Sequence, residues 1–99
     1  MPKGYWIAHV HVHDPERYKS YLAEAGPAYK EHGANLIVRG GQATEVWGSG
    51  LGARHVVIEF PTLEAARACY ASDAYQSAER RRDAAAIAHV VIVEGVSVS

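Results

Sequence analysis

The chain has 99 residues, with 10 Lys and Arg against 11 Asp and Glu, for a formal net charge of −1 at pH 7. Its 48% hydrophobic and 21% charged residues are typical of a globular protein and exclude a disordered chain. The balanced charge argues against general binding to nucleic acid or anionic membranes, and the single cysteine excludes an internal disulfide framework and a Cys-rich zinc site. We therefore expect one cytoplasmic domain over residues 1–99 that binds neither nucleic acid nor membrane.

The first predicted elements are a strand and a long helix. Residues 5–12 are rich in β-branched and aromatic side chains, which indicates a strand. Asp14-Pro15 then begins a helix, as N-cap and first helical residue, and His32-Gly33 ends it. The helix carries an amphipathic stripe of Tyr18, Leu22, Ala25 and Tyr29. Because Pro27 lacks a backbone donor, we expect the Gly26-Pro27 pair to bend or break the helix midway.

The middle of the chain predicts an interrupted strand and a turn. Residues 35–39 indicate a second strand, Gly40-Gly41 interrupts it, and residues 44–47 resume an extended conformation. We therefore expect a bulge or sharp bend at the two glycines. Residues 48–52 form a flexible turn that superficially resembles a phosphate-binding loop. A strand follows this turn instead of a helix, which excludes a dinucleotide or P-loop site.

The last third of the chain completes the predicted fold. Residues 54–60 indicate a third strand, and Pro61-Thr62 ends it and caps a helix over residues 63–70. Ser72-Asp73 caps a further helical segment that runs to about residue 86. Residues 87–93 indicate the last strand, and residues 95–99 a short tail. The order βαββαβ predicts a ferredoxin-like α+β fold, with a four-stranded antiparallel sheet and both helices on one face.

Side chains alternate along a strand, so residue parity assigns them to the two faces of the predicted sheet. One face is apolar and should pack under the helices; it holds Trp6, Ala8, Val10, Val12, Val56, Ile58, Phe60, Ala88, Val90 and Ile92. The other, called the mixed face below, holds Ile7, His9, His11, His55, Val57, Glu59, Ile87, His89, Val91 and Val93. Because the mixed face is too apolar to lie wholly in water, we expect a second copy of the chain to cover it in a two-fold homodimer.

Several segments together match the pattern of a known family. They are Val12-His13-Asp14-Pro15-Glu16, Val38-Arg39-Gly40-Gly41, Val57-Ile58-Glu59-Phe60-Pro61-Thr62-Leu63-Glu64-Ala65-Ala66, Tyr70-Ala71-Ser72-Asp73-Ala74-Tyr75-Gln76 and Val91-Ile92-Val93-Glu94-Gly95. Over nearly its whole length the chain resembles the bacterial domain-of-unknown-function family thirteen-thirty, in the dimeric α+β barrel superfamily. The resemblance implies a homodimer whose two sheets form a barrel, and it implies no established activity. Related barrels include cofactor-free monooxygenases, haem-degrading enzymes and small-molecule isomerases, whose ligands commonly lie between sheet and helices.

The ionisable residues of the mixed face are the first candidate site. His9 and His11 are two residues apart on one strand, so their Cα atoms lie about 7 Å apart and their side chains point the same way. Three adjacent strands bring His55, His89 and Glu59 to the same surface. We predict acid–base catalysis by these residues, because imidazole has a reference pKa of about 6.5. The alternatives are a polar patch in the dimer interface and a metal site, although no metal is assigned because nothing in the sequence establishes its geometry.

The second candidate site is a helix-side pocket with aromatic walls. Residues that suit a flat apolar ligand there are Trp6, Tyr18, Tyr21, Tyr29, Trp47, Tyr70 and Tyr75, with ordinary packing as the alternative. The predicted ligand-binding residues are Arg39, Tyr18, Tyr21 and Trp47. Arg39 suits a ligand carboxylate, and its alternative role is an ion pair with Glu59. Glu59 is interpreted as an ion-pair partner, either of Arg39 or of a histidine across the dimer.

Two further features are interpreted as structural. The Arg80-Arg81-Arg82 run is flanked by acidic residues, which is typical of a solvated helix surface. Cys69 lies in an alanine-rich helix and is expected to be a buried, inert thiol.

The leading functional hypothesis is a small cofactor-independent enzyme that acts on an aromatic or carbonyl-bearing ligand. A mixed-face histidine would move protons and Arg39 would hold an anionic group. A non-enzymatic ligand-binding or dimerisation module is the alternative, and a histidine metal site on the sheet is the second alternative. The sequence does not decide whether the ligand binds on the helix side of the sheet or inside the barrel.

Overall fold

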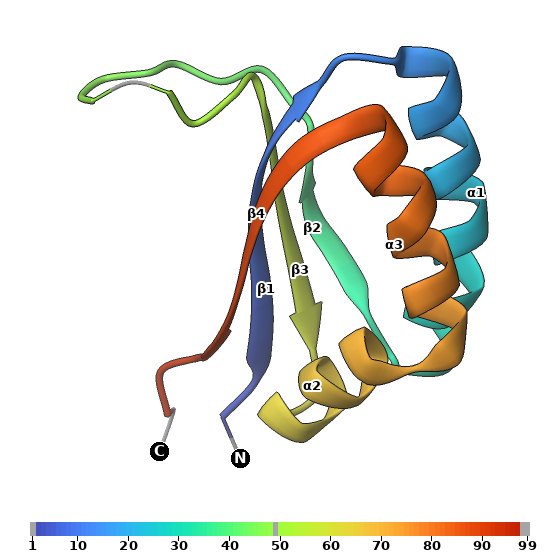
Figure 1. The fold of residues 1–99 in the computed structure, drawn as a ribbon. Coiled ribbons are helices and arrows are strands. Elements are labelled where there is room, and N and C mark those ends of the chain that lie inside the picture. Colours follow the sequence, from blue (N-terminus) through green and yellow to red (C-terminus); the bar gives the residue numbers. More distant parts are fainter. Residues whose placement is uncertain (1, 49, 98–99) are drawn as a thin grey trace.

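The computed structural model describes residues 2–48 and 50–97. The elements follow the chain in the order β1 (Gly4–Val12), α1 (Pro15–Glu31), β2 (Asn35–Arg39), β3 (Arg54–Phe60), α2 (Leu63–Ala71), α3 (Asp73–Ala85) and β4 (Ala86–Glu94). The four strands form one antiparallel sheet in the order β2-β3-β1-β4. The helices all lie on one side of the sheet (Figure 1), which confirms the ferredoxin-like βαββαβ fold. Ser49 of the predicted turn, and Val98 and Ser99 of the predicted tail, lie outside the described residues.

The helix N-termini form where capping side chains were expected. The Asp14 carboxylate accepts a hydrogen bond from the Arg17 backbone N–H, and Pro15 is the first helical residue of α1. The hydroxyl of Thr62 caps α2 through the backbone N–H of Ala65. The hydroxyl of Ser72 caps α3 in the same way, so the second helical region is divided into α2 and α3 at this residue.

The break that was one expected outcome at Gly26-Pro27 does not occur, because α1 runs through Pro27 to Glu31. Pro27 removes one backbone donor and leaves the carbonyl of Ala23 without its helical partner. Ala23 is exposed, so water can satisfy this carbonyl. Gly26 has no Cβ to clash with the proline ring, and the helix is held on both sides of the proline by the buried Ala25 and Ala28.

The bend predicted at Gly40-Gly41 is present at Gly40, and a β-bulge that was not predicted lies earlier in the second strand. The register shifts between Leu36, which pairs with Ile58, and Val38, which pairs with Val57. Ile37 is therefore the extra residue of a β-bulge, and the side chains beyond it change face. Arg39 pairs with Val56, a residue of the apolar face, and so lies on the helix side of the sheet.

The predicted extended segment over residues 44–47 is also wrong, since no strand forms in residues 40–48 and 50–53. The last ladder hydrogen bond runs from the Gly40 N–H to the His55 carbonyl. Gly40 has a φ of +67°, a left-handed conformation that directs the chain away from β3. Residues 41–48 then project beyond the sheet (Figure 1), where they have no neighbouring strand to pair with.

The core lies between the sheet and the helices, as residue parity predicted. Trp6, Val10, Ile58 and Phe60 of the apolar face are buried. Trp6 is central, because its ring contacts those of Phe60, Tyr29, Tyr70 and Tyr75, and its indole N–H donates to the Ala66 carbonyl at 2.9 Å. No helix among the described residues is both long and apolar enough to cross a membrane.

Candidate functional site

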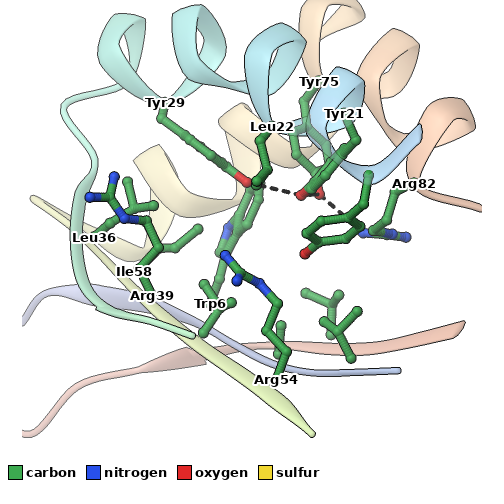
Figure 2. A pocket seen from close by; sticks show the side chains of 15 residues that line it. Trp6, Tyr21, Leu22, Tyr29, Leu36, Arg39, Arg54, Ile58, Tyr75 and Arg82 are labelled. Carbon is green, nitrogen blue, oxygen red and sulfur yellow. Dashed lines mark hydrogen bonds between the residues drawn. The ribbon is translucent and has the colours of Figure 1, made fainter. Parts of the chain in front are cut away.

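Two adjoining hollows lie between α1 and the sheet, and Figure 2 shows the side chains that line the inner one. The inner pocket holds about 30 Å³, which is room for one water molecule, and is lined by Trp6, Ala8, Val10, Tyr18, Tyr21, Leu22, Tyr29, Leu36, Arg39, Arg54, Val56, Ile58, Tyr75, Arg82 and Val90. The outer cleft holds about 560 Å³ and is lined by Leu22, Gly26, Tyr29, Lys30, Ala34, Leu36, Arg39 and Arg54. The outer cleft is therefore large enough for a small organic molecule.

The outer cleft is positively charged. Lys30, Arg39 and Arg54 line it, and none of the described lining residues of either hollow is His, Asp, Glu or Cys. Neither Arg39 nor Arg54 forms an ion pair among the described residues. Arg39 reaches this cleft because the bulge at Ile37 turns it to the helix side. The cleft can therefore attract an anionic group without first breaking an ion pair.

Arg54 is held in the cleft by its neighbours. Its guanidinium carbon lies 5.3 Å from the centre of the Tyr18 ring, a cation–π distance. A methyl group on Gly40 would overlap Nη1 of Arg54 and lie 2.8 Å from its Cζ, so the glycine leaves the space that the guanidinium fills. The Nε atom of Arg54 is buried and has no hydrogen-bond partner among the described residues.

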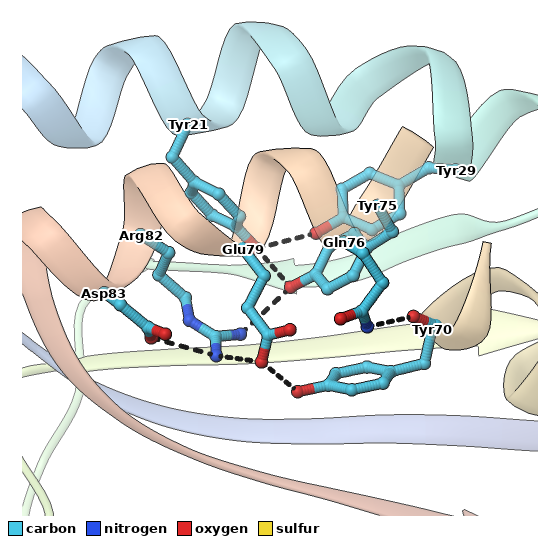
Figure 3. Close-up of polar contacts among 8 residues, drawn as sticks. All are labelled: Tyr21, Tyr29, Tyr70, Tyr75, Gln76, Glu79, Arg82 and Asp83. Atoms are coloured by element: carbon cyan, nitrogen blue, oxygen red, sulfur yellow. Dashed lines mark hydrogen bonds and ion pairs between the residues drawn. The ribbon is translucent and has the colours of Figure 1, made fainter. Parts of the chain in front are cut away.

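A chain of tyrosine hydroxyls forms the inner end of the site (Figure 3). The Tyr21 hydroxyl lies 3.0 Å from that of Tyr29 and 2.8 Å from that of Tyr75. Arg82 is buried, with 6% of the residue exposed. Its guanidinium donates to the Tyr75 hydroxyl at 3.0 Å and to Glu79 at 3.0 Å. Burial raises the pKa of the Tyr29 and Tyr75 phenols far above the usual value. They are therefore neutral near pH 7 and act as hydrogen-bonding groups, not as bases.

His9 of β1, His55 of β3 and His89 of β4 form a row on the mixed face. His9 lies directly opposite His55 on one side and His89 on the other. The Nδ1 atoms of His9 and His55 are 2.9 Å apart and the ring centres 5.1 Å apart, so the nitrogens face one another and one ring donates to the other. Among the residues described, no three His, Cys, Asp or Glu side chains are placed to hold a metal ion.

The other predicted residues of the mixed face are separated from this row or paired elsewhere. His11 is exposed and lies opposite Ile87. Glu59 accepts hydrogen bonds from Lys3 at 3.2 Å and from the Tyr5 hydroxyl at 3.0 Å, and not from Arg39, which lies on the other face. These two hydrogen bonds lower the pKa of Glu59 below its usual value. A general base for neutral pH needs a shift in the opposite direction.

The outcomes for the predicted pocket residues differ. Tyr18, Tyr21 and Arg39 line the inner pocket, whereas Trp47 lies in the projecting loop, is 92% exposed and lines neither hollow. The interpretation of Arg82 as a solvated surface residue is wrong. The sequence did contain a sign of this burial, because Arg82 lies at helical spacing from the other buried residues of α3, which are Tyr75, Ala78 and Ala85. Cys69 is buried as expected, and burial raises the pKa of its thiol to about 12.

Comparison with protein families matches residues 3–96 to a domain of unknown function, DUF1330. The chain belongs to the DUF1330 family. A comparison with curated proteins found no match for this DUF1330 protein.

Comparison with solved structures shows where this fold recurs. A protein of unknown function from Rhodopseudomonas palustris has a TM-score of 0.77 at 15% identity, over 97% of this chain and 84% of its own. SnoaB, a cofactor-independent oxygenase from Streptomyces nogalater, has a TM-score of 0.64 at 11% identity, over 99% and 97%. A candidate antibiotic biosynthesis monooxygenase from Caulobacter crescentus has a TM-score of 0.66 at 11% identity, over 97% and 92%. At these identities the DUF1330 protein shares the fold of these proteins, and the similarity shows nothing further.

Proposed function

We propose that the protein binds a small planar organic molecule, aromatic or carbonyl-bearing, in the outer cleft and acts on it without a bound cofactor. The observation that carries this proposal is an apolar, aromatic inner pocket that shares Tyr29, Arg39 and Arg54 with an open cleft of about 560 Å³. A flat ring suits the aromatic and aliphatic walls, and an oxygen substituent suits the guanidinium groups. The common fold with a cofactor-independent oxygenase supports chemistry that needs no cofactor.

The lining residues restrict the chemistry that the cleft can support. Neutral phenols and guanidinium groups stabilise negative charge that develops on a substrate oxygen, as in an enolate or phenolate. The described lining residues supply no carboxylate, imidazole or thiol that could remove a proton. The substrate class that fits is therefore one whose own acidity allows it to ionise near neutral pH.

The second candidate is a binding module that causes no turnover, and the same absence of a base among the described lining residues favours it. The acid–base role predicted for His9, His55 and His89 requires a ligand on the mixed face, because the sheet separates these side chains from the cleft. We accordingly expect His9→Ala to leave ligand binding in the cleft unchanged.

Ligand binding in the cleft can be tested with Trp6 fluorescence. Trp6 lines the inner pocket, and the only other tryptophan, Trp47, is exposed and can be replaced by Phe. The Trp47→Phe protein should show a saturable change in emission with benzoate or phenylacetate. Leu22→Phe in this background, which narrows the boundary between the hollows without adding a tryptophan, should weaken it. Absence of a saturable response to both acids, and to benzamide and phenylacetamide, would overturn the proposed function.

We further infer that a second copy of the chain covers the mixed face. Ile87 and Val91 on this face are 60% and 57% exposed, and Val38 and Val93 are also exposed. These aliphatic side chains surround the histidine row, so a like surface can bury them. Sedimentation should give a dimer for the wild type and a monomer for Val91→Glu. Val46→Glu, in the projecting loop, is the matched control and should remain dimeric; a monomeric wild type contradicts the inference.

A further inference from the structure

Arg82 restricts the order in which the three tyrosine hydroxyls donate to one another. A guanidinium group only donates, so the Tyr75 oxygen must accept from Arg82. The hydroxyl protons of the three tyrosines can then point outward, from Tyr75 to Tyr21 to Tyr29, or inward along the same path. In each order, the hydroxyl at one end of the chain has a proton that neither of the other two tyrosines accepts. The inward order leaves this proton on Tyr75, and the outward order leaves it on Tyr29.

Two observations favour the outward order. Tyr75 is 1% exposed and does not line the outer cleft, so a proton left unused there would be a buried unsatisfied donor. Tyr29 is also buried, at 8% exposed, but it lines both hollows, and its hydroxyl points into the inner pocket, where a water or a ligand oxygen that enters from the outer cleft can accept its proton. The positive charge of Arg82 beside the Tyr75 oxygen also repels the hydroxyl proton toward Tyr21. The buried cation therefore orients three successive hydroxyl dipoles toward the cleft, and each bond polarises the next.

We propose that Tyr29 is the anion-binding donor of the cleft, that Arg82 orients it through Tyr75 and Tyr21, and that Tyr29, Arg39 and Arg54 together bind the carboxylate or enolate oxygen of a planar organic anion. This proposal rests on the proposed function and names its substrate class. Tyr29 lines both hollows beside the two arginines, and Figure 2 shows its hydroxyl directed into the inner pocket. Arg82 is a positioning residue, since it reaches the cleft only through the other hydroxyls.

An acid and its primary amide separate this charge-specific role from general packing. Benzoate and benzamide have nearly the same shape, but only benzoate carries a charge. In the Trp47→Phe background we expect benzoate to bind at least tenfold more tightly than benzamide. Tyr29→Phe should reduce this ratio about tenfold, and Tyr21→Phe, which breaks the chain without touching the cleft arginines, should reduce it about threefold. The affinity for benzamide should change little in either variant.

The control variant is Tyr5→Phe. The Tyr5 hydroxyl is also hydrogen-bonded, to Glu59, but it lies on the mixed face. Tyr5→Phe should therefore leave the affinities for benzoate and benzamide unchanged. An unchanged benzoate-to-benzamide ratio in Tyr29→Phe overturns the role of Tyr29, and an unchanged ratio in Tyr21→Phe overturns the orientation by Arg82. Equal wild-type affinities for the two probes refute the anion site but leave the proposed function standing. The proposed function itself is refuted only if phenylacetate and phenylacetamide also fail to bind.

Discussion

Replacement of Gly40 by Ala should damage the site more than it damages the fold. Gly40 has a φ of +67°, a conformation that costs an ordinary L-residue about 1–2 kcal/mol. For a domain of this size that cost lowers the melting temperature by about 4–16 °C, from about 4–8 °C per kcal/mol. The new methyl group also overlaps the guanidinium of Arg54, which is the flexible end of its side chain and can move. Its movement out of the cleft should remove one charge-assisted hydrogen bond and weaken benzoate binding about tenfold.

Two other glycines of the same loop separate these effects. Gly48 has a φ of +75° but an added methyl group would contact nothing within 4 Å, so Gly48→Ala reproduces the backbone strain alone. Gly41 has neither a positive φ nor a close neighbour, so Gly41→Ala should change neither stability nor binding. Thermal unfolding and benzoate titration of the three variants, at one protein concentration, test the assignment. Equal benzoate affinity in Gly40→Ala and Gly48→Ala would refute the placement of Arg54 in the site.

The remaining predictions concern the fold. Trp6→Phe removes the indole N–H that donates to the Ala66 carbonyl and should cost about 1–3 kcal/mol in urea unfolding; a cost near zero would contradict the importance of that hydrogen bond. Cys69 should resist alkylation at pH 8 in the folded protein, because its thiol pKa is about 12. Since this pKa is raised in the folded state, stability should fall as the pH rises through the unfolded thiol's pKa of about 8.5, an effect that Cys69→Ala should abolish. The pKa of Glu59 is lowered, so its stabilising effect should be present at neutral pH and be lost as the pH falls through its folded-state pKa. Wild type and Glu59→Gln should therefore differ in melting temperature at pH 7 and converge toward pH 3; a constant difference would contradict this linkage.

Local signals in the sequence were sufficient for the order of elements and for the faces of β1, β3 and β4. Parity and strand order placed His9, His55 and His89 in one row, because no irregularity intervenes in β1, β3 or β4. They did not determine the face on which Arg39 lies, because the single extra residue of the bulge at Ile37 reverses parity and nothing in the local pattern marks its position. The glycines that follow mark the bend at Gly40 and not the bulge.

Arg82 illustrates a different limit. A run of three arginines between acidic residues is typical of a solvated surface, yet one member of the run is buried because α3 presents it toward Tyr75 and Glu79. The helical spacing carried this information, but the cost of burying a charge argued against using it. The partners that offset this cost come from α2 and α3 and hydrogen-bond in one network, which Figure 3 shows and which the sequence does not reveal.

The most direct test of the central claim is a crystal structure of the protein with 4-iodobenzoate, in which anomalous scattering locates the iodine. We expect the ligand in the outer cleft between α1 and β2, with its carboxylate within hydrogen-bond distance of Arg39, Arg54 and the Tyr29 hydroxyl. Iodine located on the mixed face beside His9 and His55, with the cleft empty, would contradict the account and favour the histidine site instead.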